Sequence, residues 1–252
     1  MWRTLAIACC LGGCAGPGQT APNATPAPSD ADAGDATADT EAALKPEETS
    51  PLVWHTIDVS GDTVEYATLG EPREGGPVLL ALPPGPQTRP MVEAGLERWA
   101  DAMATDGWFV VSPTSPKGTF FEESAAVLPP FVEATAKHHG FPPRGLLLFG
   151  MSNGGLSAFK LAIADPGRFR ALVTIPGRPT DEDMTRVDAL SGIPVAMVVG
   201  ADDDAFWKTG AETASAALDA AGGNVTLQVV PDTGHAAHID IDWPALRKLF
   251  GA

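Results

Sequence analysis

Short apolar runs alternate with longer helix-compatible stretches along most of the chain, and this alternation limits the possible folds more than any other feature. Each run is about five residues long and is bounded by glycine or proline. The runs occupy residues 78–82, 108–112, 146–149, 171–175, 195–199 and 226–230. Continuous apolarity over this length is typical of strands that are buried on both faces, as in a parallel sheet covered by helices.

Helix-compatible stretches fill the intervals between these runs. They occupy residues 91–105, 127–139, 156–164, 206–221 and 243–250. Two earlier segments, 52–59 and 63–69, predict an antiparallel pair. The chain should therefore form an α/β fold, in which right-handed crossovers build a mostly parallel sheet of about eight strands flanked by helices.

The N-terminal region differs from the rest of the chain. Residues 1–14 combine one cation with a short apolar run and small residues, which predicts a secretory signal peptide. Leu-Gly-Gly-Cys at its end resembles the lipobox of bacterial lipoproteins, and this resemblance implies an acylated Cys14; an ordinary signal peptide or a cytosolic N-terminus is the alternative. Residues 15–50 are rich in Ala, Pro, Thr and Asp and lack aromatic side chains, which predicts a disordered tether. A folded domain should span 51–252.

Charge and cysteine positions exclude several functions. The chain has 32 acidic and 16 basic residues, for a formal net charge of −16, and offers no basic stripe for nucleic acid. All three cysteines precede the tether, so the domain should contain no disulfide and no thiol nucleophile. We expect no nucleic-acid partner, secretion across the inner membrane, and membrane contact only through the lipid anchor. Ala15 after Cys14 resembles outer-membrane sorting within the cell envelope.

A serine flanked by glycines stands directly between a predicted strand and a predicted helix. The motif is Gly-Met-Ser-Asn-Gly at 150–154, and Gly155 follows it. Glycines are needed where a sharp strand-to-helix turn strains the serine and brings neighbouring elements close. The helix start would also favour an oxyanion through its dipole. Ser152 is therefore the candidate nucleophile.

A serine hydroxyl needs a base to take its proton, and that base needs an acid to hold its tautomer. The strand at 195–199 is followed by Asp202, Asp203 and Asp204, and the strand at 226–230 is followed by His235. Because parallel strands place their carboxyl ends at one edge of the sheet, these side chains should converge on Ser152.

Three segments carry a family resemblance: GMSNGGLSAFKLAIADPGRFRALVTIPG, VVGADDD and PDTGHAAH. They resemble the α/β-hydrolase fold family, in particular its single-domain esterases such as feruloyl esterases and polyhydroxyalkanoate depolymerases, and the resemblance covers about residues 53–250. It implies Ser152 as nucleophile, His235 as general base and Asp203 as the acid, with Asp204 and more weakly Asp202 as rivals. It also implies an ester hydrolase that forms an acyl-enzyme intermediate on small or polymeric esters, without a cofactor. We expect no metal either, because no H-E-x-x-H motif accompanies His235 and His238.

The resemblance further implies an oxyanion hole made by the backbone N–H of Asn153 and one N–H from the loop 82–88. Most relatives begin this loop with His-Gly, whereas this chain has Pro-Gly, and prolines at 83, 84 and 86 have no N–H to give. The second donor is therefore limited to Gly85, Gln87 or Thr88, and we favour Gln87.

Substrate contacts are expected from Gly85, Phe120 and Trp207. Only 18 residues, 176–193, separate the strands between which some relatives insert a lid, so we expect an open site without a cap domain. His55, His138 and His139 are interpreted as structural. Two other functions stay open: a peptidase resembling prolyl oligopeptidases, and a catalytically silent binding lipoprotein, which the proline-rich loop favours.

Overall fold

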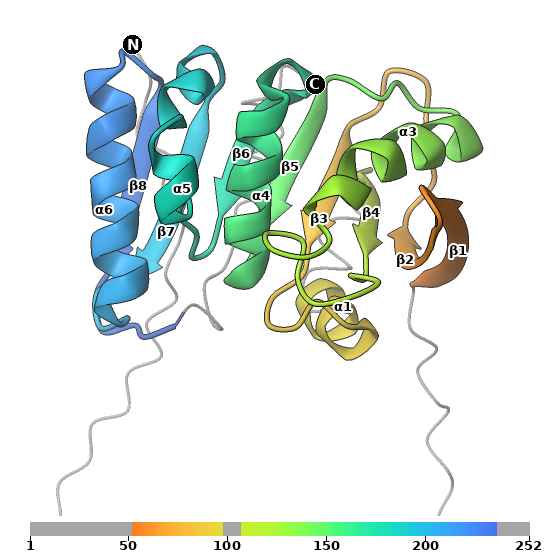
Figure 1. The fold of residues 1–252 in the computed structure, drawn as a ribbon, viewed down its shortest axis with the longest axis horizontal. Helices are drawn as coiled ribbons and strands as arrows, with labels where there is room; N and C mark the ends of the chain where they lie inside the picture. Colours follow the sequence, from red (N-terminus) through yellow and green to blue (C-terminus); the bar gives the residue numbers. More distant parts are fainter. Residues whose placement is uncertain (1–51, 98–106, 236–252) are drawn as a thin grey trace, which may run out of the picture. The chain divides into compact units, whose positions relative to one another are not determined.

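The computed structural model describes residues 52–97 and 107–235 (Figure 1). The predicted signal segment, Cys14, the tether and the predicted helix at 243–250 lie outside the described residues, so they stay predictions. None of the helices in the described part is both long and apolar enough to cross a bilayer.

One sheet of eight strands has the order β1-β2-β4-β3-β5-β6-β7-β8. β1 (Val53–Val59) and β2 (Asp62–Leu69) form an antiparallel hairpin, and β2 also runs antiparallel to β4. The remaining neighbours are parallel. Their strands are β3 (Val78–Leu82), β4 (Phe109–Pro113), β5 (Leu146–Gly150), β6 (Phe169–Thr174), β7 (Val195–Gly200) and β8 (Val225–Val230). The mostly parallel sheet predicted from the apolar runs is confirmed.

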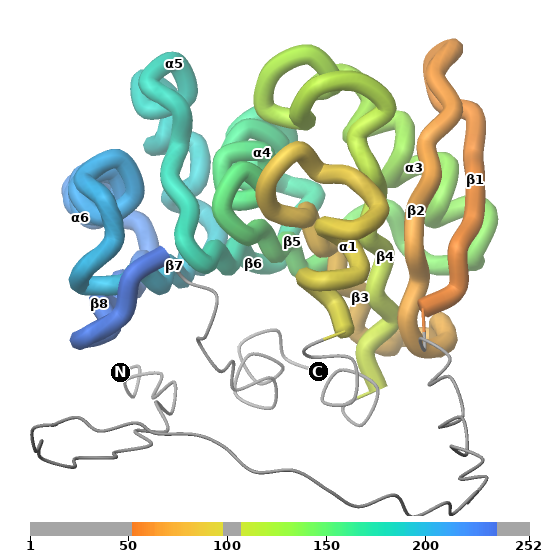
Figure 2. Tube along the Cα trace, turned by 90° about the horizontal axis from the view of Figure 1, so that it is seen from below, coloured from red at the N-terminus to blue at the C-terminus, as the bar shows by residue number. Residues whose placement is uncertain are grey.

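Helices connect the parallel strands, and α3, α4 and α6 lie along one face of the sheet (Figures 1 and 2). The segment between β6 and β7, all of it described, contains only α5 and η4. The helices are α1 (Arg89–Leu96), α3 (Leu128–His139), α4 (Asn153–Ala164), α5 (Asp181–Met184) and α6 (Ala205–Ala220); the 3-10 turns are η2 (Ala125–Val127), η3 (Pro166–Arg168) and η4 (Val187–Gly192).

Helix α4 begins earlier than the sequence predicts. The helix-compatible stretch predicted from the sequence starts at residue 156, after two glycines, and glycine weakens helices by about 1 kcal/mol. The structure starts the helix at Asn153, directly after Ser152. Packing of the glycines against neighbouring backbone outweighs their low helix propensity.

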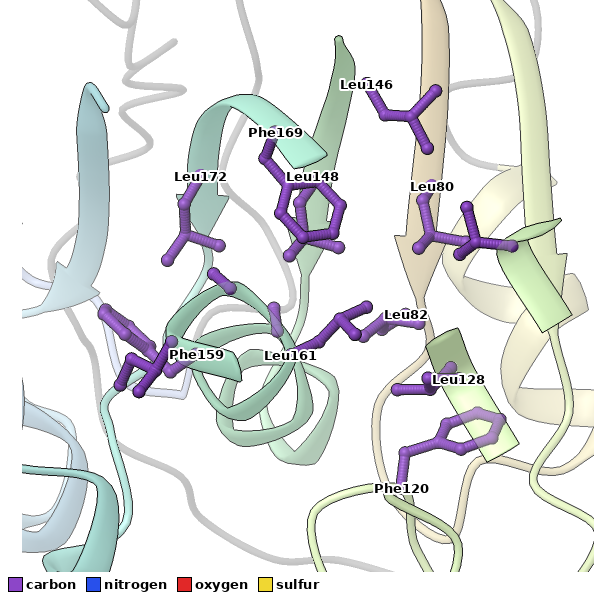
Figure 3. Packing of buried hydrophobic residues seen from close by; sticks show 14 of the residues in the cluster. Leu80, Leu82, Phe120, Leu128, Leu146, Leu148, Phe159, Leu161, Phe169 and Leu172 are labelled. Atoms are coloured by element: carbon purple, nitrogen blue, oxygen red, sulfur yellow. The ribbon is translucent and has the colours of Figure 1, made fainter. Parts of the chain in front are cut away.

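Alternating side chains of the central strands divide the core into two layers. Leu80 and Leu82 join the cluster that includes Phe159 and Leu161 of α4 (Figure 3). Leu79 points to the other layer, which includes residues of α1. Burial of each such leucine stabilises the fold by about 1.5–3 kcal/mol. Strands held from both faces fix the positions of the loops that follow their carboxyl ends.

Candidate active site

Ser152 occupies a strained turn between β5 and α4. Its backbone has φ 54° and ψ −120°, a region that costs a non-glycine residue on the order of 1–3 kcal/mol. The N–H of Ser152 donates to the carbonyl of Pro176 at 2.9 Å, and its own carbonyl accepts the N–H of Gly155 at 2.7 Å. These bonds hold the serine at the carboxyl edge of the sheet.

The glycines of the motif allow close packing around this turn. A Cβ atom on Gly154 would lie 2.0 Å from the carbonyl oxygen of Leu82, at the end of β3. A Cβ atom on Gly150 would lie 2.3 Å from the carbonyl oxygen of Gly154. Both neighbours are backbone atoms that cannot move aside cheaply, so the spacing of the motif follows from the close contacts of α4 with β3 and β5.

The structure brings Ser152, His235 and Asp203 together from three loops that follow β5, β8 and β7. His235 Nε2 lies 2.9 Å from Ser152 Oγ, and His235 Nδ1 lies 3.1 Å and 3.2 Å from the two carboxylate oxygens of Asp203. The Asp203 side chain is 2% exposed, whereas that of His235 is 46% exposed. A buried carboxylate at Nδ1 favours the tautomer whose Nε2 lone pair faces the serine.

Backbone contacts place the histidine loop across the end of β7. The N–H of Asp202 donates to the carbonyl of Thr233 at 2.9 Å. A Cβ atom on Gly200 would lie 2.1 Å from that same carbonyl oxygen. The absence of a side chain at position 200 therefore lets the loop approach closely enough for His235 to contact Asp203.

The other two candidate acids have different roles. Asp204 is the N-cap of α6, where its Oδ1 accepts the N–H of Phe206 at 2.9 Å and of Trp207 at 3.3 Å. Asp202 contributes its backbone N–H to the histidine loop. Among these three residues, Asp203 is the one whose carboxylate meets the imidazole.

Replacing Asp204 by alanine should separate its capping role from catalysis. We expect Asp204→Ala to lower the free energy of unfolding by about 1 kcal/mol, because α6 loses its N-cap, and to change ester hydrolysis little. Urea denaturation and initial rates measure the two effects. Asp204→Asn is the matched control, since asparagine caps equally well. A loss of activity in Asp204→Ala as deep as that of a nucleophile variant would make Asp204 the acid.

Gln87 is not free to donate its N–H to a substrate, so the structure contradicts our preference for it in the oxyanion hole. Its N–H donates to the carbonyl of Pro84 at 3.1 Å within a tight turn, and its φ is +56°. Gly85 and Thr88 remain as donors from this loop. The side-chain amide of Asn153 donates to the carbonyl of Gly85 at 3.1 Å, which ties Gly85 to the serine turn.

The Gln87 side chain instead joins three segments at the site. It is fully buried, at 0% exposed. Its Nε2 donates to the carbonyl of Pro83 at 3.2 Å and to Ser157 Oγ at 3.0 Å. Its Oε1 accepts the N–H of Phe120 at 2.6 Å. Ser157 in turn donates to the carbonyl of Asn153 at 2.9 Å. Gln87 thus connects the loop after β3, the loop after β4 and the first turns of α4.

The predicted aromatic substrate contacts lie deeper than expected. Phe120 is 1% exposed and belongs to the core cluster (Figure 3), so the prediction that it contacts substrate is wrong. Trp207 is also buried, and its ring centroid lies 5.2 Å from that of His235. It therefore supports the imidazole from the core side.

Sequence reasoning missed Phe206, an exposed aromatic side chain beside this site. It is 50% exposed, and its ring meets that of Trp207 edge-on with centroids 4.9 Å apart. The guanidinium of Arg178 lies over the Phe206 ring, 4.6 Å from its centroid. The sequence does contain one signal for this residue, namely a large apolar side chain in the first turn of α6, the helix that follows Asp203.

A group of three histidines lies in a different part of the fold. One ligand nitrogen from each of His55, His138 and His139 lies within 4.8 Å of the others. Burial, then the nearby His138 and His55, lower the pKa of His139 to about 4. Burial, followed by His138, also lowers the pKa of His55. Within the described residues these imidazoles could hold a cation, although the sequence indicated no metal site.

Comparison with known proteins finds similarity to an esterase over part of the chain. No protein-family model matches the sequence. Over 114 residues the chain is 30% identical to the esterase YpfH of Escherichia coli K12; the match covers 44% of this chain and 48% of the relative. The chain therefore spans about half the length of the curated relative that it matches.

Solved structures agree on the fold. A thermostable esterase superimposes with a TM-score of 0.65 at 15% identity, over 80% of this chain and 63% of that one. A ferulic acid esterase superimposes with a TM-score of 0.60 at 18% identity, over 79% of this chain and 98% of that one. Together with the strand order and the position of the serine turn, these likenesses show that the chain has the α/β-hydrolase fold, as its sequence predicts.

Proposed function

We propose that this protein is a serine hydrolase that cleaves carboxylic esters through an acyl-enzyme intermediate. The observation that carries the proposal is the position of the His235 imidazole between Ser152 Oγ and the buried Asp203 carboxylate. The similarity to an esterase over part of the chain supports esters as the substrate class.

In the proposed acylation step, Ser152 Oγ attacks the ester carbonyl carbon while His235 Nε2 accepts the hydroxyl proton. The Asp203 carboxylate stabilises the resulting imidazolium. The tetrahedral intermediate then expels the alcohol, which takes the proton from His235. Water attacks the acyl carbon in the second step and gives a proton to His235, and the acid leaves as the Ser152 hydroxyl is restored.

The negative charge that forms on the carbonyl oxygen needs two N–H donors. We assign the first to Asn153, the first residue of α4, where the N–H groups have no partner within the helix and the dipole favours an anion. We assign the second to Gly85, because Asn153 holds its carbonyl beside the serine turn. Such donors contribute about 2.7–4 kcal/mol each to transition-state stabilisation.

The exposed surface beside His235 suits an apolar group of the substrate. Phe206 offers its ring to solvent next to Trp207, and Arg178 covers part of it. The exposed imidazole of His235 leaves access from solvent, which suits small esters as well as chains of a polymeric ester.

A fluorophosphonate probe tests the proposal directly, because it bonds covalently only to an activated serine. We expect labelling of the intact protein, with the probe mapped by mass spectrometry to the peptide that contains Ser152, and no labelling of Ser152→Ala. Circular dichroism establishes that both proteins are folded. A folded but unlabelled wild type would favour the silent binding function, and faster turnover of aminoacyl amides than of matched esters would favour the peptidase.

A further inference from the structure

Three of the five histidines in the chain meet at the N-terminal edge of the sheet. His55 lies in β1, and His138 and His139 are the last two residues of α3. The centroids of their rings are 4.7–6.3 Å apart. β1 is the first strand in the sheet order, whereas β7 and β8, which carry Asp203 and His235 at their ends, are the last two. The group is therefore separate from the catalytic site.

Two of these rings already have an oxygen partner on one nitrogen. His55 Nε2 lies 2.9 Å from Thr68 Oγ1, and His139 Nε2 lies 3.0 Å from the hydroxyl of Tyr66. Both partners are buried residues of β2. Histidines that bind metals usually donate their second N–H to an oxygen in this way, which fixes the ring and its tautomer. For an ion to bind without displacing these two contacts, Nδ1 of His55 and Nδ1 of His139 would be its ligands.

The histidine group packs against aromatic side chains on one side and is open to solvent on the other. Tyr66 stacks on His55 with centroids 4.9 Å apart, and Phe109 contacts His139 at 5.2 Å. His138 is exposed, so an ion can enter and keep a water molecule. Imidazole nitrogens without carboxylates favour Zn²⁺, Cu²⁺ and Ni²⁺ over Mg²⁺ and Ca²⁺. The net charge of −16 favours cations in general.

We propose that His55, His138 and His139 bind a divalent transition-metal ion, Zn²⁺ foremost, which links β1 to the end of α3. Zinc holds imidazole nitrogens at about 2.0–2.1 Å in tetrahedral geometry, and a water would occupy the fourth position. The nitrogens must approach one another by roughly 1–1.5 Å from their present separation. The exposed His138 can supply most of that movement by a change of rotamer. The ion would fasten the N-terminal hairpin to the rest of the sheet.

Zinc binding to the metal-free full chain tests this proposal. Titration calorimetry should detect one zinc ion per chain at this group, measured in a His235→Ala background so that the active-site imidazole does not compete. At a hundredfold excess over the dissociation constant, the melting temperature should rise by roughly 5–10 °C. Co²⁺ in place of Zn²⁺ should give the visible absorption of a low-coordinate nitrogen site.

Three variants decide the outcome. His138→Gln should lose the calorimetric signal, the thermal shift and the Co²⁺ spectrum, and it should fold normally because the side chain is exposed. His55→Gln should lose them as well. Lys137→Gln, an exposed substitution on the same turn of α3, is the matched control and should bind like the parent. The proposal fails if the parent shows no thermal shift with Zn²⁺, or if His138→Gln binds Zn²⁺ as the parent does.

Discussion

Replacing Ser152 by alanine is expected to lower kcat/KM for an activated ester such as p-nitrophenyl acetate by on the order of 10⁴- to 10⁶-fold. The variant keeps His235, Asp203 and the proposed oxyanion donors, but it has no oxygen that can bond to the acyl carbon. Its unfolding should change little, because alanine fits the same turn and the hydroxyl that is lost is hydrogen-bonded to the exposed His235. Initial rates together with a urea denaturation curve measure both effects.

A double variant makes this test sharper. His235→Gln should reduce kcat/KM about as deeply as Ser152→Ala, and combining the two should add little, because members of a catalytic unit act together. If the losses in kcat/KM of the two single variants multiply in the double variant, the 2.9 Å contact between His235 and Ser152 is not used in the reaction. Equal rates for wild type and Ser152→Ala would refute the proposed function.

The sequence predicts the parts of this protein that depend on local pattern and on general topology. Apolar runs locate the strands to within one or two residues, because β3 to β7 are almost entirely buried and such strands are mostly apolar. β8 is more exposed, although its run also predicts its position. The meeting of Ser152 with Asp203 and His235 follows from the rule that parallel strands end at the same edge. That rule does not identify which of the three neighbouring aspartates is the acid. The geometry of the turn decides it, because it makes Asp204 the N-cap of α6 and buries the carboxylate of Asp203 beside His235.

Tertiary contacts explain the predictions that were wrong. A loop phenylalanine is expected near the surface, yet the Phe120 side chain packs into the core cluster, and its N–H donates to the buried side chain of Gln87. Sequence reasoning considered only the backbone N–H of Gln87, and nothing local indicates where its amide would find partners. The histidine group is equally hidden, because β1 and α3 are far apart in sequence.

Replacing Gln87 by leucine should have the second largest effect, on stability as well as on catalysis. Leucine has a similar volume, but it cannot accept the N–H of Phe120 or donate to Pro83 and Ser157. Buried groups without partners cost roughly 1–3 kcal/mol each. We expect the free energy of unfolding to fall by about 3–5 kcal/mol on this basis.

The catalytic effect of Gln87→Leu should appear in kcat, with KM nearly unchanged. The loop that carries Gly85 and the helix start that carries Asn153 are joined through Gln87 and Ser157, so their N–H groups would lose alignment with the oxyanion. A misplacement of about 1 Å costs on the order of 10²-fold in rate, and oxyanion donors act mainly in the transition state. Urea denaturation and Michaelis–Menten kinetics, measured where the variant is folded, give the two values.

Ser157→Ala is the matched control, because it removes one partner of Gln87 and leaves the bonds to Pro83 and Phe120 in place. It should cost about 1 kcal/mol of stability and lower kcat less than Gln87→Leu does. If Gln87→Leu is destabilised but keeps its kcat, Gln87 holds the core together without aligning the oxyanion donors. If both kcat and stability fall more in Gln87→Leu than in Ser157→Ala, with KM constant, the buried amide of Gln87 both stabilises the packing of the loops and aligns the oxyanion donors.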